Sequence, residues 1–276
     1  MVGIGYRKDF AEEFSENTLN PAFIEVAPEN WINVGGYYKK MFDKILEKYP
    51  LFVHGLSLSV GSPEGIDVAF VKQVKQFLDE TKAVEYSEHL SFSKCENAHL
   101  FDLLPIPFTE DAVKNVSKNI RQVQDILERK IAIEIVSYYT PIAPEISEID
   151  FINSIVSEAD CNLLLDVNNV YVNGFNHQYN PKEFIPKLDL SKVKYIHMAG
   201  HTKVASDLII DTHGENIIDP VYDLFQFTME LMQRDVPILL ERDFNIPELE
   251  VLQHEMDRLQ IIKTNALKQH KHAIIS

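Results

Sequence analysis

Residues 193–199, VKYIHMA, have the pattern of a buried strand: strand-forming Val193, Tyr195 and Ile196 run directly into His197. Seven more short apolar runs share this character, at residues 2–6, 22–27, 51–55, 83–89, 131–136, 161–167 and 236–242. Amphipathic stretches that predict helices lie between them, at residues 37–49, 67–82, 109–130 and 221–235. Apolar strands alternating with helices indicate a parallel sheet, and eight such units predict a (β/α)8 TIM barrel.

The length of 276 residues suits one large domain. We predict a single domain over residues 1–276, with the barrel at roughly 2–262 and a C-terminal tail at 263–276. A doubly wound open sheet is the alternative fold. It is disfavoured because no G-x-G-x-x-G motif follows an early strand.

Composition excludes several classes of protein. The formal charge is −16, from 42 acidic and 26 basic residues, and no Lys/Arg cluster is present, which argues against nucleic acid as a partner. No apolar run reaches the roughly 18 residues of a membrane span. The N-terminus, MVGIGYRKDF, lacks the pattern of a signal peptide, so we expect a cytoplasmic protein. With only Cys95 and Cys161, a disulfide framework is excluded.

Polar side chains stand at or near the ends of six predicted strands. They are His54, His89, Glu134, Asp166, His197 and Glu241. In a TIM barrel the active site lies at the C-terminal ends of the strands, so we expect these six side chains to share one pocket. A single strand histidine is more often a satisfied core residue, and a strand-end Asp often caps the next helix. Six together are harder to explain in that way.

Three carboxylates and three imidazoles in one pocket would repel like charges in a partly desolvated site. Among basic residues, little beyond Arg7 and Arg242 lies near the strand ends. Metal ions would resolve the repulsion, and mixed imidazole and carboxylate ligands suit Fe, Mn or Zn. One ion cannot use every ligand, so we predict a multinuclear centre in which Glu134 bridges.

Further candidate ligands follow two of the strands. Asp211 and His213, in IDTHG, stand two apart and would project to one side of an extended segment, with Gly214 allowing a turn. Asn169 comes shortly after Asp166 and offers an amide oxygen. A surface loop and a turn are the alternative explanations. His201 could be a ligand or a partner of one, ranked below His197.

Several of these segments together resemble the DUF692 family, also called UPF0276. They are VHGLSLSVGSPEG, YSEHLSF, LLLDVNNVYVN, YIHMAGH, IDTHG and LLERD, in this order, and the resemblance runs from FIEVAPENW nearly to the end of the chain. Members are described as multinuclear non-heme iron-dependent oxidases, of which methanobactin biosynthesis protein B is an example. The resemblance therefore implies a barrel that binds two or three irons of mixed Fe(II)/Fe(III) state.

The resemblance also implies roles for individual residues. His54, His89, Glu134, Asp166, His197 and Glu241 would be the core ligands and catalytic residues, with Asn169, Asp211 and His213 forming a further metal position. The implied reaction is O₂-dependent oxidation of cysteine in a ribosomally made precursor peptide. Some relatives also need a partner protein that presents the peptide.

Two positions depart from the family pattern. Ile135 replaces an Asn that often follows the fifth-strand Glu, and Arg242 stands where many relatives carry Trp, which would alter the pocket wall. Two other functions fit the ligand set. One is a metal-dependent hydrolase or isomerase of the xylose-isomerase-like barrel type, which would use a redox-inert metal. The other is a non-catalytic metal-binding scaffold subunit.

Overall fold

The computed structural model describes the chain except for residues 9–10, 12–13, 15–18, 96–97, 141–143 and 276. Eight strands form a closed parallel barrel in the order β1-β12-β9-β8-β7-β4-β3-β2. Their bounds are Val2–Gly5 (β1), Ile24–Val26 (β2), Leu51–Gly55 (β3), Glu85–His89 (β4), Ala132–Glu134 (β7), Asn162–Asp166 (β8), Val193–Met198 (β9) and Ile238–Leu240 (β12). Each strand lies within a predicted apolar run, so the (β/α)8 fold is confirmed.

Residue contacts divide the chain into two compact units, and each is described by itself. Unit 1 comprises Met1–Ile24 and Leu165–Ser276, and unit 2 comprises Glu25–Leu164. The single domain expected for residues 1–276 stays a prediction. Within the described residues, no helix combines the length and the apolar character needed to cross a membrane.

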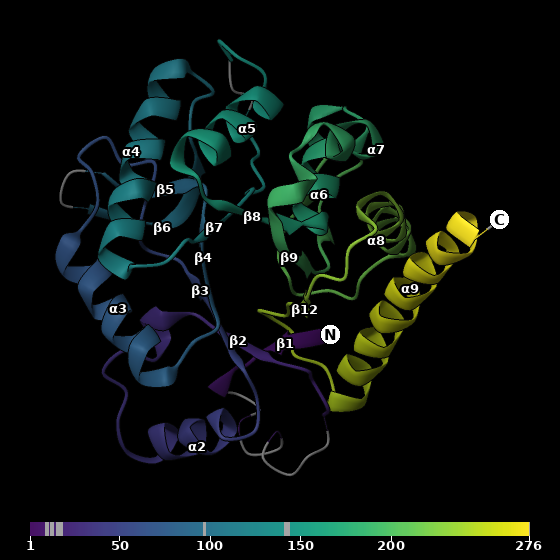
Figure 1. Cartoon of the computed structure of the whole chain (residues 1–276), viewed down its shortest axis with the longest axis horizontal. Helices are drawn as coiled ribbons and strands as arrows, with labels where there is room; N and C mark the ends of the chain where they lie inside the picture. The colour runs from purple at the N-terminus through teal and green to yellow at the C-terminus, as the bar shows by residue number, and fades with distance from the viewer. Residues whose placement is uncertain (9–10, 12–13, 15–18, 96–97, 141–143, 276) are drawn as a thin grey trace. The chain divides into compact units, whose positions relative to one another are not determined.

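In unit 2 the helices alternate with the strands along the chain. They are η2 (Pro28–Asn30), α2 (Gly36–Leu46), α3 (Val68–Thr81), α4 (Glu110–Leu127) and α5 (Glu148–Ala159). Helix α4 packs against both α3 and α5, as Figure 1 shows. Thr109 is the N-cap of α4, and its side chain accepts a hydrogen bond from the Ala112 amide. Asp67 and Ser147 cap α3 and α5 in the same way.

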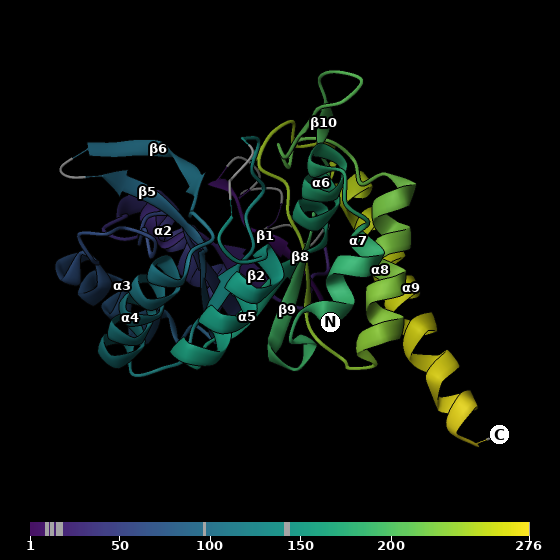
Figure 2. The ribbon, with the colours of Figure 1, turned by 90° about the horizontal axis from the view of Figure 1, so that it is seen from above.

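A hairpin that the sequence did not predict follows β4. Strands β5 (Ser91–Cys95) and β6 (Ala98–Pro105) pair antiparallel, with Ser91 opposite Pro105. Figure 2 shows the hairpin as a pair of arrows at the edge of unit 2. Cys95 is the last residue of β5.

Unit 1 contains helices from the second half of the chain. They are α6 (Val167–His177), α7 (Pro181–Phe184), η3 (Ile185–Lys187), η4 (Leu190–Lys192), α8 (Asp219–Met232) and α9 (Leu249–Ile275). The short strands β10 (Thr202–Lys203) and β11 (Ile209–Ile210) follow β9 in the sequence and pair antiparallel with each other. Helices α8 and α9 lie side by side (Figures 1 and 2).

The C-terminal helix does not break where the tail was expected to begin. Helix α9 continues through residue 263 to Ile275. Lys263 is 2% exposed, and its ammonium donates to the Val236 carbonyl at 2.6 Å and pairs with Asp235 at 2.5 Å. The predicted tail therefore begins inside helix α9, and its first residue is packed within unit 1.

Candidate metal centres

All six strand-end residues lie at the C-terminal ends of their strands. His54 is the penultimate residue of β3, and His89 and Glu134 end β4 and β7. In unit 1, Asp166 ends β8, His197 is the penultimate residue of β9, and Glu241 directly follows β12. Three of the six side chains belong to unit 2 and three to unit 1, and the contacts within each unit are described in turn.

In unit 2, His54, His89 and Glu134 form a group that we call the unit-2 triad. The Nε2 atoms of the two histidines lie 3.1 Å apart. Glu134 Oε2 is 2.8 Å from His54 Nε2 and 3.4 Å from His89 Nε2. The strand register places His89 directly beside Glu134. Two imidazole nitrogens and one carboxylate oxygen therefore converge in a buried space.

The outer ring nitrogens of the triad histidines have hydrogen-bond partners that fix the rings. His89 Nδ1 lies 2.9 Å from the Gly55 carbonyl oxygen, which can only accept, so Nδ1 carries the proton. In the neutral ring, His89 Nε2 then carries a lone pair that faces His54 and Glu134. His54 Nδ1 bonds to Ser87 Oγ at 2.7 Å. Metal-binding histidines are oriented in this way by partners on the far ring nitrogen.

Glu88, which was not predicted as a site residue, is hydrogen-bonded to the backbone next to the triad. Its carboxylate accepts the amides of Leu58 at 3.0 Å and His89 at 2.9 Å, which joins the segment after His54 to β4. Burial raises the pKa of Glu88 to about 8, and the charge of Glu29 adds to the shift. Gly55 makes room for this carboxylate, because a Cβ at Gly55 would lie 2.4 Å from Glu88 Oε1.

In unit 1, the second group, which we call the unit-1 cluster, consists of Asp166, His197, Asp211, His213 and Glu241. Ligand atoms of Asp166, His213 and Glu241 all lie within 4.8 Å of one another. Glu241 Oε2 is 2.9 Å from His197 Nδ1 and 3.3 Å from His213 Nδ1. His213 Nε2 is 2.8 Å from Asp211 Oδ1. The predicted pair after strand β11 thus joins the strand-end ligands.

The charges of the unit-1 cluster are strongly coupled. Burial alone would lower the pKa of His213, but Asp211 and Glu241 outweigh it and hold that pKa well above its usual range. Burial would raise the pKa of Glu241, yet His197 and His213 hold it well below its usual range. Arg7 adds positive charge 3.7 Å from Glu241 and also pairs with Asp243. Without a metal ion, these histidines balance the carboxylates.

Asp166 has both of the roles considered for it. Its Oδ1 accepts the Asn169 amide at 2.8 Å and caps α6, while Oδ2 lies 3.8 Å from His213 Nε2. The capping explanation and the ligand explanation therefore hold together. Asn169 lies in the first turn of α6 and is 3% exposed. Its side chain as a metal ligand stays a prediction.

The segment that carries His213 is held closely in unit 1. His213 itself adopts a left-handed conformation with φ of 49°, which is uncommon for a residue other than Gly. The expected turn residue was Gly214. The His213 carbonyl accepts the Asp243 amide at 2.8 Å. Gly200 also abuts this segment, because a Cβ there would lie 2.0 Å from the Glu215 carbonyl oxygen.

Asn168 and His201 belong to a hydrogen-bonded chain that the sequence could not indicate. His201 Nδ1 lies 2.7 Å from Asn168 Oδ1, and Asn168 Nδ2 donates to Asp211 Oδ1 at 2.7 Å. Of the two roles considered for His201, the structure favours the partner over the ligand.

Arg242 is buried and bonded within unit 1, and its effect on a pocket wall stays a prediction. Its guanidinium is 4% exposed and donates to Glu255 Oε2 at 3.1 Å and Asn216 Oδ1 at 2.7 Å. The side chain therefore turns toward α9, because a buried guanidinium needs a buried carboxylate.

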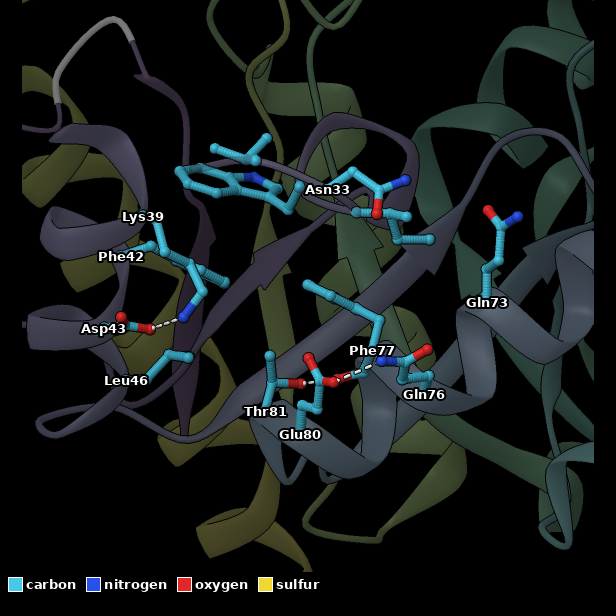
Figure 3. Close-up of a pocket in the computed structure, with 13 residues that line it drawn as sticks. Asn33, Lys39, Phe42, Asp43, Leu46, Gln73, Gln76, Phe77, Glu80 and Thr81 are labelled. Carbon is cyan, nitrogen blue, oxygen red and sulfur yellow. Dashed lines mark hydrogen bonds and ion pairs between the residues drawn. The ribbon is translucent and has the colours of Figure 1, made fainter. Parts of the chain in front are cut away.

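One cavity of unit 2 has no triad residue in its lining. A space of about 230 Å³ opens between α2 and the C-terminal half of α3, over stacked Trp31 and Phe42 (Figure 3). Its walls come from the segment after β2 and from α2 and α3, and they include none of His54, His89 and Glu134. Its charged side chains are already bonded within the wall, as Lys39 with Asp43 and Glu80 with Gln76. It gives no sign of a charged ligand.

A second cavity of unit 2 follows the ligand end of β3. Its volume is about 220 Å³, and it is lined by Glu29, Ser57, Leu58, Ser59, Gly65, Asp67, Phe70 and Lys94. Ser57 to Ser59 come directly after His54 and Gly55 in the chain. This polar cavity, with one lysine and two acidic side chains, is thus next to the triad in sequence.

Comparison with known proteins agrees with these motifs. Residues 1–264 match the family described as RiPP precursor modification enzyme MbnB/TglH/ChrH. The chain belongs to this family. A UPF0276 protein of Shewanella sediminis (strain HAW-EB3) is 45% identical over 100% of this chain and 96% of its own length. The UPF0276 protein Nmul_A2550 of Nitrosospira multiformis is 48% identical over 95% of this chain and 93% of its own. The DUF692/UPF0276 resemblance is confirmed.

Solved structures show the same fold at low identity. A xylose isomerase domain protein from Alicyclobacillus acidocaldarius superposes with a TM-score of 0.61 at 12% identity, covering 96% of this chain and 99% of that one. The likeness supports the barrel alone. As a member of a family of precursor-modifying enzymes, the chain is an enzyme with two groups of possible metal ligands.

Proposed function

We propose that this enzyme is an O₂-dependent, multinuclear non-heme iron oxidase that modifies cysteine residues of a ribosomally made precursor peptide. The observation that carries the proposal is the clustering of buried histidine and carboxylate side chains in a chain of the precursor-modifying family. We further propose that each group binds iron, which gives at least two ions, and that a partner protein presents the peptide.

The donor atoms fit iron. The unit-2 triad offers two imidazole nitrogens and a carboxylate oxygen, the combination found in non-heme iron(II) oxygenases that keep open positions. The unit-1 cluster offers more carboxylate, from Asp166, Asp211 and Glu241, which suits a harder, more oxidised ion. Bound iron would supply one-electron and O₂ chemistry that no side chain of the protein provides.

The protein's own residues would bind, orient and shield. His89 and His54 are fixed through Gly55 and Ser87, so they need little rearrangement to bind a metal. Burial of both groups excludes water, which protects reactive states from side reactions. The cavity after β3 offers hydroxyl, carboxylate and ammonium groups for a peptide backbone and its side chains.

The test is anaerobic purification from iron-replete cells, followed by metal analysis and Mössbauer spectroscopy. We expect two or more irons per chain and O₂ consumption when a cysteine-containing precursor peptide is added. A matched sample reconstituted with zinc should bind the peptide without consuming O₂. One zinc per chain and no iron would instead indicate the hydrolase or isomerase alternative, and metal without any turnover would indicate a scaffold.

A further inference from the structure

The cavity of about 220 Å³ after β3 is built from three segments that each follow the ligand end of a barrel strand. Glu29 lies in η2 after β2, Ser57 to Ser59 follow β3, and Lys94 lies in β5 after β4. The rest of the lining comes from the start of α3 and the residues just before it. In barrel enzymes the segments after the strands form the substrate-binding face, so this cavity lies on that face of unit 2.

One wall of the cavity is joined directly to the triad. Glu88 accepts the amide of Leu58, which lines the cavity, at 3.0 Å and the amide of His89 at 2.9 Å. The two amides are therefore separated by no more than two hydrogen bonds and one carboxyl group. An extended peptide advances about 3.3 Å per residue, so a segment of a few residues spans the distance from this wall to the triad.

The two acidic side chains of the cavity serve mainly its walls. Glu29 Oε1 accepts the Leu56 amide at 2.9 Å, and Glu29 Oε2 has no contact with solvent. Asp67 is the N-cap of α3, and its Oδ1 accepts the amides of Ala69 at 2.9 Å and Phe70 at 3.1 Å. The positive end of the helix dipole also offsets the charge of Asp67. These carboxylates therefore hold the cavity in shape.

The donors of the cavity are less committed. Lys94 is half-buried, and no carboxylate in the described part of the chain pairs with its ammonium. Ser59 Oγ accepts the amides of Ser93 at 3.0 Å and Lys94 at 3.2 Å, which fixes the backbone of Lys94 against the segment after β3. A hydroxyl that accepts two bonds still has its own hydrogen to donate. With the half-buried hydroxyl of Ser57, the cavity presents one cation and two hydroxyl donors.

We propose that this cavity is a substrate subsite that binds the side-chain carboxylate of an aspartate or glutamate of the precursor peptide. Lys94 forms the ion pair and determines the specificity, while Ser57 and Ser59 donate hydrogen bonds to the carboxylate. The whole chain has a formal charge of −16, so an acidic peptide gains nothing from the overall field and depends on a local cation. The inference rests on the peptide substrate of the proposed function, but it requires neither metal nor oxidation.

Binding is tested with three blocked tripeptides that contain no cysteine. They are N-acetyl-Gly-Asp-Gly-amide and the two counterparts in which Asn or Lys replaces Asp. Each is titrated into nitrogen-15-labelled protein, and the NMR signals of the Ser59 and Lys94 amides are followed. The Asp peptide should shift both signals and bind roughly tenfold more tightly than the Asn peptide, because it alone forms a charge-assisted bond. The Lys peptide should bind more weakly still.

Two substitutions of Lys94 separate its charge from its packing. Lys94→Met keeps an unbranched apolar stem without the ammonium, so the Asp and Asn peptides should bind equally. Lys94→Glu should reverse the order, with the Lys peptide binding best, and a misfolded protein could not produce such a reversal. Lys118→Glu is the matched control, because it makes the same change of charge at an exposed position of α4 and should keep the wild-type order.

A preference for the Asp peptide that survives in Lys94→Met would overturn the subsite. So would wild-type protein in which none of the three peptides shifts the two amide signals at millimolar concentration. O₂ consumption with a cysteine-containing precursor peptide is an independent measurement. If O₂ is not consumed while Lys94→Met abolishes the Asp preference, the subsite is supported and the oxidase is not. If O₂ is consumed while the wild-type protein shows no Asp preference, the oxidase is supported and the subsite is not.

Discussion

Arg242 and Glu255 form a buried ion pair, with Nη2 3.1 Å from Oε2. Arg242 directly follows the cluster residue Glu241, and Glu255 lies on α9. The same two side chains also hold the segment after His213, because Arg242 donates to Asn216 at 2.7 Å and Glu255 accepts the Ile217 amide at 3.0 Å. One ion pair thus fastens the end of β12, a ligand-bearing segment and the last helix.

Breaking this pair from one side should be costly. In Glu255→Gln the Arg242 guanidinium stays buried without its counter-charge, so the free energy of unfolding should fall by about 3–5 kcal/mol in urea titration. Asp219→Asn is the matched control, because the Arg258–Asp219 pair is exposed and its loss should cost less than about 1 kcal/mol. Similar losses from both variants would show that burial does not decide the effect.

The close approach of Gly200 to the segment after His213 should make a single methyl group harmful. Gly200→Ala places Cβ 2.0 Å from the Glu215 carbonyl oxygen, so the backbone that carries His213 must move. We expect lower metal affinity in the unit-1 cluster, measured by competition with a chelator. Gly35→Ala is the control, because nothing lies within 4 Å of a Cβ there. An unchanged affinity in Gly200→Ala would contradict this.

The two ligand groups should differ in their response to mutation. Glu134→Ala removes the carboxylate between His54 and His89, and we expect loss of metal occupancy and of all oxidase activity. His213→Ala removes a ligand carried by a loop, so total metal should fall while the ions held by strand residues persist. Metal analysis and Mössbauer spectroscopy report both. Full metal in Glu134→Ala, or none in His213→Ala, would refute this division.

Stability should depend on pH through Glu148. Burial raises the pKa of Glu148 to about 7, although the 3.0 Å bond from Tyr138 opposes the shift. Between the usual carboxylate range and pH 7, the folded protein keeps a proton that the unfolded chain has released. The free energy of unfolding should therefore fall by roughly 2 kcal/mol as pH rises through this window. Urea titrations of Glu148→Gln should show a decline that is smaller by this amount, because the raised pKa of Glu88 contributes to the decline in both proteins; the same slope in both proteins would argue against Glu148.

Neither cysteine should take part in catalysis. Cys161 is fully buried just before β8, at the end of that strand away from Asp166, and Cys95 ends β5 in the hairpin. The Cys95→Ser, Cys161→Ser double variant should retain metal and oxidase activity, with a modest loss of thermal stability from a hydroxyl in the core. Loss of iron from this variant would require a cysteine ligand.

The strands were predictable because each is a short apolar run that ends in polar residues, and barrel geometry then places those ends together. The β5–β6 hairpin was missed because no Asn-Gly or similar two-residue turn signal marks it. Glu88 was overlooked beside His89, since only the tertiary structure shows that its carboxylate reaches Leu58. Asn168 and His201 are 33 positions apart, and no sequence period connects them.

The unit-2 triad lies in a unit made of one continuous stretch of chain. The unit-1 cluster lies in a unit that contains both ends of the sequence. During synthesis, His54, His89 and Glu134 leave the ribosome well before Glu241 does. The earlier ligands can therefore meet a metal ion while the later ones do not yet exist. In a chain stalled before residue 165, the three side chains of the unit-2 triad are present and the unit-1 cluster is absent, so the proposed metal loading of the two groups can be tested separately.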